Sequence, residues 1–378
     1  MSNVEPARAR GIGSTPPPAA GCPGRVPRRA SWHPPGVPRN RTPRRAARAA
    51  AVLLLLAAAV AAAGCGAGPA AQQRPEVPAR LVLDFTPNAA HAGIYSAVAR
   101  GFDAAEGVAL DVRVPGSSTD GGKLVLSGRA AFAVMDLHDL ALQRARGRDL
   151  VAIMAIVQAP LASVLAAPDV RRPRELAGRQ VGVTGLPSDD AVLRAIVAGD
   201  GGDPAAVERV TIGFNAVAAL LGGRVAGATA FWNVEGVALR AQRPGARIFR
   251  LDAAGAPAYP ELVLVTSGAR LREEPAVARA AVRALVRGYQ LTATDPESSL
   301  SDLTGRVRGL DRDQLAAQLD LLGPALAPAG RPIGAFDEPT LRRWARWEAR
   351  MGIVPRPVDV DGAFALALPR EAARAVAD

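Results

Sequence analysis

The chain has 378 residues, of which 49% are apolar, so it is long enough for two ordinary domains with sizeable cores. Its formal charge of +11 is concentrated near the start, because residues 1–64 contain ten Arg and one acidic residue, Glu5. The rest of the chain is almost neutral and lacks the basic footprint of a nucleic-acid-binding protein, so we expect no nucleic-acid partner.

The first residues predict a disordered tail and an export signal. Residues 1–45 are rich in Pro, Arg, Gly and Ala and show no apolar period. Residues 46–64 have a basic start, an apolar run of about 15 residues and small residues at the end, which is the layout of a secretory signal. The ending AAAGC resembles the bacterial lipobox, which implies lipidation of Cys65; a free cysteine after an ordinary signal is the alternative. Residues 65–79 have the composition of a flexible tether.

From residue 80 onward, short apolar runs alternate with amphipathic segments, the pattern of an α/β protein. The segment after residue 267 is expected to be helical, with a core-facing stripe at Val282, Leu285, Val286 and Tyr289. We expect ten strands, at residues 80–84, 109–114, 131–135, 151–157, 162–166, 180–184, 210–214, 227–231, 247–251 and 262–266.

Two connections favour two lobes over one sheet. A charged linker with two prolines lies between the strands expected near residues 165 and 180, and a second connection returns the chain near residue 260. We therefore expect residues 80–167 and 265–378 to form lobe 1 with the C-terminal helices, and residues 168–264 to form lobe 2. Two such crossings form a hinge that can close a cleft over a ligand.

The chemistry-bearing residue types are few. Cys22 and Cys65 are the only cysteines, which excludes a disulfide framework. The three histidines, at positions 33, 91 and 138, offer no metal-ligand spacing. We therefore expect neither a metal nor a cofactor.

Five segments carry a family resemblance: LDFTPNAAHAGIYSAVARGFDAAEGVALDV, GRAAFAVMDLHDLALQRARG, LAGRQVGVTGLPSDDAVLRA, AFWNVEGVALR and AYPELVLVTS. In this order they resemble the extracytoplasmic solute-binding proteins related to the thiamine-pyrimidine synthases of fungi. The nearest resemblance is to receptors for thiamine pyrimidine precursors or riboflavin, and it spans about residues 80–355. It implies the two-lobe, type II periplasmic-binding-protein fold, with a small heterocyclic ligand in the cleft. The implied partner of the monomeric receptor is the membrane permease of an ABC importer.

Ligands of open α/β sheets lie beyond the carboxyl ends of strands, where each of these motifs falls. After the first strand, Asp84 would offer an acceptor and Phe85 a ring face, while Asn88 fixes the turn; a capped turn with a solvated Asp84 is the alternative. His91 is as consistent with a bond to a backbone carbonyl as with ligand contact. The candidates in lobe 1 are Asp84, Phe85, Asn88, His91, Tyr95 and Asp136.

In lobe 2, Asp189 and Asp190 occupy a helix start that would otherwise attract an anion, which disfavours sulfonate or nitrate, although capping alone also explains them. We expect Trp232 to stack on a heteroaromatic ring, with packing in the core as the alternative. The remaining candidates follow strand ends or lie at the return crossing. The candidates here are Ser188, Asp189, Asn215, Trp232, Asn233, Glu235 and Tyr259.

The sequence favours a binding receptor over an enzyme. The fungal synthases depend on a cysteine-rich iron-binding segment and a lysine that holds pyridoxal phosphate, but here the corresponding GAPAYPELVLV has no cysteine and Lys123 is the only lysine. We expect a lipid-anchored, extracytoplasmic binding component of an ABC importer for a hydroxymethylpyrimidine or formylaminopyrimidine type of ligand. A riboflavin receptor is the alternative. A sulfonate or nitrate receptor, a synthase-like enzyme and a surface lipoprotein without a ligand are less favoured.

Overall fold

Ten strands form two five-stranded sheets in this computed structural model, which describes residues 76–115 and 120–377. The first sheet has the order β2-β1-β3-β10-β4 and the second the order β7-β6-β8-β5-β9. Every strand predicted from the sequence is confirmed, with ends displaced by at most three residues. The strands are β1 Val77–Val82, β2 Val108–Arg113, β3 Phe132–Asp136, β4 Leu150–Val157, β5 Ala162–Ala166, β6 Gln180–Val183, β7 Glu208–Thr211, β8 Gly227–Phe231, β9 Arg247–Arg250 and β10 Leu262–Ser267.

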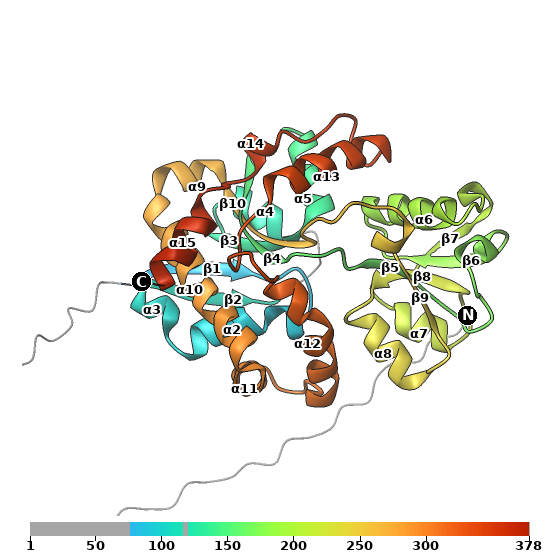
Figure 1. Cartoon of the computed structure of the whole chain (residues 1–378), viewed down its shortest axis with the longest axis horizontal. Helices are drawn as coiled ribbons and strands as arrows, with labels where there is room; N and C mark the ends of the chain where they lie inside the picture. Colours follow the sequence, from blue (N-terminus) through green and yellow to red (C-terminus); the bar gives the residue numbers. More distant parts are fainter. Residues whose placement is uncertain (1–75, 116–119, 378) are drawn as a thin grey trace, which may run out of the picture. The chain divides into compact units, whose positions relative to one another are not determined.

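Helices follow most strands, and the chain after β10 is largely helical (Figure 1). None of the helices between residues 76 and 377, outside the gap at 116–119, combines the length and apolar character that crossing a membrane requires. The predictions for residues 1–45, for the signal segment 46–64 and for Cys65 lie outside the described residues. The longer helices are α2 Ala92–Ala99, α4 Asp120–Leu126, α5 Leu137–Ala145, α6 Pro187–Gly199, α7 Ala216–Leu221, α8 Glu235–Gln242, α9 Gly268–Glu273, α10 Pro275–Thr294, α11 Pro296–Arg306, α12 Arg312–Leu326, α13 Glu338–Arg350 and α15 Leu368–Ala377. The short ones are η1 Ala89–His91, α3 Phe102–Ala105, η2 Pro173–Leu176, η3 Pro204–Ala206, η4 Asp252–Ala254 and α14 Val360–Ala363.

The first sheet is buried on both faces, as its apolar strands require. Successive side chains of a strand point to opposite faces, and accordingly Leu81 and Leu83 belong to one apolar cluster while Val82 belongs to another. The same alternation separates Phe132 from Ala133. Because both faces need cover, the chain returns after β10 to add the C-terminal helices to this sheet.

The two sheets exchange strands at two crossings. The first crossing, residues 158–161, joins β4 to β5, and the second, residues 251–261, joins β9 to β10. Strand β5 pairs with β8 and β9, so residues 162–166 lie in lobe 2 and not in lobe 1 as expected. Strand β10 pairs with β3 and β4, which moves residues 262–264 into lobe 1. An apolar run identifies a strand but not the sheet it joins, and this is why the expected boundaries differ.

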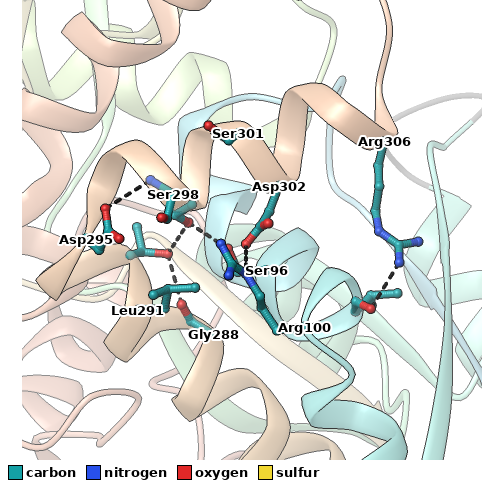
Figure 2. A network of polar contacts seen from close by, with 12 residues as sticks. Ser96, Arg100, Gly288, Leu291, Asp295, Ser298, Ser301, Asp302 and Arg306 are labelled. Atoms are coloured by element: carbon teal, nitrogen blue, oxygen red, sulfur yellow. Dashed lines mark hydrogen bonds and ion pairs between the residues drawn. The ribbon is translucent and has the colours of Figure 1, made fainter.

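The long helix α10 anchors the C-terminal helices to lobe 1. All four residues of its predicted stripe are buried, against α2 and the first sheet. Helix α11 is tied to α2 and α10 by a chain of buried hydroxyls: Ser299 Oγ lies 2.8 Å from Ser96 Oγ and 2.7 Å from Thr292 Oγ1. At the surface, Arg100, which directly follows α2, donates to Asp302 of α11 over 2.8 Å (Figure 2). These bonds satisfy the polar groups of a closely packed helix interface.

Candidate ligand-binding site

A cavity of about 310 Å³ lies between the two lobes, at the ends of strands from both sheets. Its lobe 1 wall comes from the segment after β1, from the start of α4 and from the β3–α5 connection; its lobe 2 wall comes from the β6–α6 loop and the segment after β8. The volume is at the small end of the range of about 300–1,000 Å³ that ligand pockets occupy. Its lining side chains that carry charge or a polar group are Asp84, Asn88, Lys123, Asp136, His138, Asp139, Gln143, Arg146, Ser163, Thr184, Ser188, Asp189, Thr229, Asn233 and Glu235.

The loop after β1 holds Asp84 at the cavity through a histidine behind it. The backbone N–H of Asn88 donates to His91 Nδ1 over 3.2 Å, so Nε2 is the ring nitrogen left to donate to Asp84 Oδ1, over 2.8 Å. Asn88 and Asp84 both line the cavity. His91 is fully buried and is not part of the wall, and Tyr95 lies in the apolar cluster beneath the sheet. The structure therefore gives His91 the geometry of a residue that orients Asp84.

The turn from β3 into α5 places a group of acidic residues in the wall. Asp136 caps α5 by accepting from the backbone N–H groups of His138, at 2.6 Å, and Asp139. Burial, reinforced by the charge of Asp136, raises the pKa of Asp139 to about 7. Burial alone would lower the pKa of His138, but the neighbouring Glu348 and Asp136 raise it to about 10. This part of the wall therefore favours positive charge.

The β6–α6 loop lines the opposite wall with Ser188 and Asp189. Asp189 Oδ2 accepts from Thr184 Oγ1 at 2.6 Å and from the backbone N–H of Gly185 at 3.0 Å, while its Oδ1 accepts from Thr229 Oγ1 at 2.9 Å. A carboxylate thus already uses the N–H groups with which such a loop would hold an anion. Asp190 is exposed, pairs with Arg209 and does not line the cavity.

The segment after β8 separates its three candidate residues. Asn233 and Glu235 face the cavity, and Asn233 Oδ1 is buried without a hydrogen-bond partner among the described residues. Burial raises the pKa of Glu235 to about 7, and the charge of Asp84 adds to this rise. Trp232 is in the apolar core instead: its Nε1 donates to Pro160 O over 2.9 Å and its ring does not line the cavity.

Two phenylalanines reach the cavity from opposite lobes. Phe85 follows β1 and Phe214 follows β7, and their ring centroids are 5.2 Å apart. The sequence analysis predicted Phe85 as a ligand-binding residue, but it named Asn215 and not the neighbouring Phe214. Asn215 is exposed, donates to Ile212 O and contributes to a different surface hollow. At this distance the two rings pack against each other across the lobes, and together they give the cavity an aromatic edge against which a planar ring can pack.

Tyr259 is in the hinge and not in the cavity wall. It is buried within the second crossing, and its hydroxyl lies 2.9 Å from His138 Nε2. Next to it, Glu261 Oε2 accepts from the backbone N–H groups of Leu161 and Ala162, the latter at 3.0 Å. A side chain of the second crossing therefore fixes the backbone of the first.

Comparison with known proteins agrees with this architecture. The family model described as NMT1/THI5 like matches residues 88–299. The chain belongs to the NMT1/THI5-like family. The resemblance inferred from the sequence segments is thereby confirmed.

Two curated relatives of this NMT1/THI5-like chain are similar over most of its length. The formylaminopyrimidine-binding protein of Halalkalibacterium halodurans is 28% identical over 295 residues, which are 75% of this chain and 88% of the relative. The riboflavin-binding protein RibY of Chloroflexus aurantiacus is 27% identical over 326 residues, 79% of this chain and 88% of the relative.

Among solved structures, the periplasmic nitrate-binding protein NrtA of Synechocystis PCC 6803 superposes with a TM-score of 0.63. It is 16% identical and the match covers 80% of this chain and 90% of NrtA. This likeness confirms the two-lobe periplasmic-binding-protein fold that the sequence predicted.

The cavity does not suit the pyridoxal phosphate of the synthases in this family. The single lysine, Lys123, is exposed at the cavity edge. The wall holds five carboxyl groups, from Asp84, Asp136, Asp139, Asp189 and Glu235, against the three cations Lys123, Arg146 and His138, whose pKa is about 10. An excess of carboxylates repels a phosphate, so the residues present do not fit that cofactor.

Several lining residues escaped the sequence-based analysis, among them His138, Asp139, Ser163, Phe214 and Thr229. Thr229 and Ser163 are inside predicted strands, whereas the candidates were chosen from residues that follow strand ends or lie at the return crossing. His138 and Asp139 could have been chosen in the same way, because they directly follow the predicted Asp136 at the start of α5.

Proposed function

We propose that this protein is the ligand-binding component of an ABC-type importer and that its ligand is a small heteroaromatic amine of the thiamine-pyrimidine-precursor class. The observation that carries the proposal is a set of hydrogen-bond acceptors on two sides of one small cavity. Asp84 faces it from lobe 1, and Glu235 and Asn233 face it from lobe 2, where Asn233 Oδ1 has no partner within residues 76–115 and 120–377. A ligand that carries N–H donors can bond to acceptors of both lobes at once, and these bonds stabilise the closed arrangement of the lobes.

An aminopyrimidine has the complementary chemistry. Its exocyclic amine donates two N–H bonds, its ring nitrogens accept, and its flat face packs against Phe85 and Phe214. A carboxyl such as Glu235, with a pKa of about 7, can accept from the amine when ionised or donate to a ring nitrogen when protonated. The relative whose name refers to formylaminopyrimidine supports this ligand class for the present chain.

Riboflavin is the second candidate, because one relative is named for binding it. Its three fused rings and ribityl chain need far more room than one pyrimidine ring, and a cavity of about 310 Å³ favours the single ring. Sulfonate and nitrate are disfavoured by the five carboxylates of the wall and by Asp189, which already occupies the N–H groups of the β6–α6 loop.

The cellular setting belongs to the same proposal. Export through the segment 46–64 and lipidation of Cys65 would anchor the protein outside the cytoplasm. The predicted tether 65–79 is too long by its last three residues, because β1 begins at Val77. The residues before β1 would leave the lobes free to meet a membrane permease. One ligand would be carried per monomer, without catalysis. Globomycin, which blocks lipoprotein processing, would leave the unprocessed chain in cells if Cys65 is the lipidation site, and a Cys65→Ser variant would not incorporate labelled palmitate.

The test of the ligand is calorimetry of the purified chain with 4-amino-5-hydroxymethyl-2-methylpyrimidine, its formylamino analogue, thiamine, riboflavin, taurine and nitrate. A ligand present at 100 times its Kd also stabilises the folded chain by about 2.7 kcal/mol, which a melting curve detects. Binding of a pyrimidine supports the proposal. Binding of riboflavin alone transfers the chain to the flavin receptors, and binding of taurine or nitrate alone refutes the argument from the carboxylates.

A matched pair of variants then tests the site. Asn233→Leu leaves a ligand N–H unpaired in a buried place, a loss of about 1–3 kcal/mol, so affinity should fall by about tenfold or more. Asn215→Leu removes the same amide group outside the cavity and should leave affinity unchanged. Equal effects of the two substitutions would contradict the placement of the site.

A further inference from the structure

The floor of the cavity, next to the hinge, contains a group of residues that the proposed function does not use. Asp136 and His138 come from the β3–α5 turn, and Glu261 comes from the second crossing, more than 120 residues later. Each offers one ligand atom, and these atoms all lie within 4.8 Å of one another. We propose that Asp136, His138 and Glu261 bind a divalent transition-metal ion such as Zn²⁺ or Mn²⁺.

The histidine is oriented as in a metal site. Its Nδ1 is hydrogen-bonded to Glu348 Oε1, while its Nε2 lies 3.9 Å from Glu261 Oε1. Metal-bound histidines almost always donate their other ring N–H to a carboxylate or carbonyl, which fixes the ring and makes the coordinating nitrogen more basic. Glu348 therefore acts as the positioning residue of the site.

Nε2 also contacts the hydroxyl of Tyr259 at 2.9 Å, and this contact does not block the site. The same hydroxyl lies 3.3 Å from Glu261 Oε2, so it can donate there when a metal takes Nε2. Glu261 Oε2 meanwhile keeps its bonds to the backbone of the first crossing, which leaves Oε1 as the coordinating atom. Binding needs only small side-chain rotations, because Zn²⁺ lies about 2.0–2.2 Å from nitrogen and oxygen ligands.

The unsatisfied atoms of this group also call for a cation. Among the residues that the structure describes, Glu261 Oε1 and Glu348 Oε2 are buried and have no hydrogen-bond partner. Both side chains are fully inaccessible to solvent, and the imidazolium of His138 is the one positive charge among the three carboxyl groups of Asp136, Glu261 and Glu348. Buried carboxylate oxygens are unfavourable unless they are paired or coordinate a metal. One imidazole with two carboxylates is a donor set suited to Zn²⁺ and Mn²⁺.

The site is open to the ligand cavity. Asp136 and His138 both line it, so an ion can enter there and keep a coordination position on the cavity side. A ligand nitrogen or oxygen could occupy that position. The metal would thus join three parts of the protein: the lobe 1 wall, the second crossing and, through Glu261, the backbone of the first crossing.

The experiment is calorimetric titration of the EDTA-treated, desalted full chain with MnCl₂ and ZnCl₂, together with the visible spectrum of the Co²⁺-loaded chain. We expect one site per chain, with Co²⁺ d–d bands that show mixed nitrogen and oxygen ligands. Asp136→Asn retains the Oδ1 that caps α5 but loses the charge, and it should weaken the metal at least tenfold. Asp302→Asn removes a surface carboxylate far along the chain on α11 and is the matched control, with unchanged affinity expected.

Two further variants separate coordination from folding. His138→Gln should abolish the site, with circular dichroism as the check on folding. Glu348→Gln should cost about 10–100-fold in affinity, as expected for the partner of a metal-bound histidine, and should shift the Co²⁺ bands. Absence of binding to the wild-type chain, or equal affinity in the Asp136→Asn and Asp302→Asn variants, would overturn the proposal.

Ligand binding measured in EDTA keeps this proposal distinct from the proposed function. If the wild-type chain binds a pyrimidine in EDTA but binds no metal, only the metal site is refuted. If it binds metal but no pyrimidine, only the ligand assignment is refuted.

Discussion

The most informative single perturbation is removal of the carboxyl group of Glu261. This side chain belongs to the second crossing and accepts hydrogen bonds from the backbone N–H groups of Leu161 and Ala162 in and next to the first crossing. Glu261→Leu deletes the acceptor while filling part of the same space. Glu261→Gln keeps one oxygen that can accept both bonds and removes only the charge.

The structure sets the size of the effect. A buried N–H left without a partner costs about 1–3 kcal/mol, and two of them lose about 2–6 kcal/mol in the leucine variant. Loss of the buried carboxyl relieves its own desolvation, but it does not supply an acceptor to the two N–H groups, which remain buried with the first crossing. We expect the glutamine variant to lose about 1 kcal/mol or less, because its oxygen preserves both bonds.

The assay is urea denaturation in EDTA, followed by tryptophan fluorescence, with hydrogen exchange of the two amides as the local readout. In the leucine variant the amides of Leu161 and Ala162 should exchange faster and the free energy of unfolding should fall; in the glutamine variant both should stay near wild type. If both substitutions destabilise equally, the charge and not the acceptor matters, and the interpretation of Glu261 as a clamp between the crossings is wrong. If neither has an effect, the two N–H groups do not depend on this side chain.

Three further predictions concern the cavity and the helices. Phe214→Ala should weaken pyrimidine binding by about 0.5–1.5 kcal/mol in calorimetry, since it removes one of the two rings at the cavity, whereas Val210→Ala on exposed β7 should have no effect; equal losses would deny the ring a role. The pKa of Glu235 is raised in the folded state to about 7, so its stabilising contribution is present at low pH and is lost as the pH rises from about 4.5 through 7. In urea denaturation between pH 5 and 8, the free energy of unfolding should therefore depend less on pH for Glu235→Gln than for wild type. The same pH dependence in both proteins would contradict this pKa. Gly288→Ala should destabilise the chain strongly, because its Cβ would lie 2.0 Å from Gly93 O between α10 and α2, while Gly305→Ala in α11 meets no atom within 4 Å and should stabilise by about 0.5–1 kcal/mol; melting curves that move in the same direction for both would refute the packing argument.

Local pattern was sufficient for much of the fold. The run at residues 162–166 is apolar and bounded by turn residues, and it forms a strand at those residues. The stripe from Val282 to Tyr289 repeats at the helical period and packs inward as expected. These predictions succeed because hydrophobic periodicity and strand or helix geometry have the same local cause, the direction of successive side chains.

Whether a residue at a strand end faces the cavity or the core was harder to predict. Asn233 and Trp232 are neighbours after β8, yet the first faces the cavity and the second donates to Pro160 O in the core. Phe214 and Asn215 differ in the same way. A shift of one residue along a strand moves a side chain to the opposite face, and the sequence alone does not fix the end of a strand to within one residue.

The sequence by itself determined the strands and helices, the near-neutral folded part and the family, because composition and periodicity are properties of neighbouring residues. Only the tertiary structure decided which sheet β5 joins, that His91 stands behind Asp84, and that His138 meets Glu261 and Glu348. The contacts of His138 with Glu261 and Glu348 join residues more than 100 positions apart, and they depend on how two sheets exchange strands at the hinge. The spacing of residues along the chain does not predict such a contact, because the contact is produced by the packing of the whole molecule.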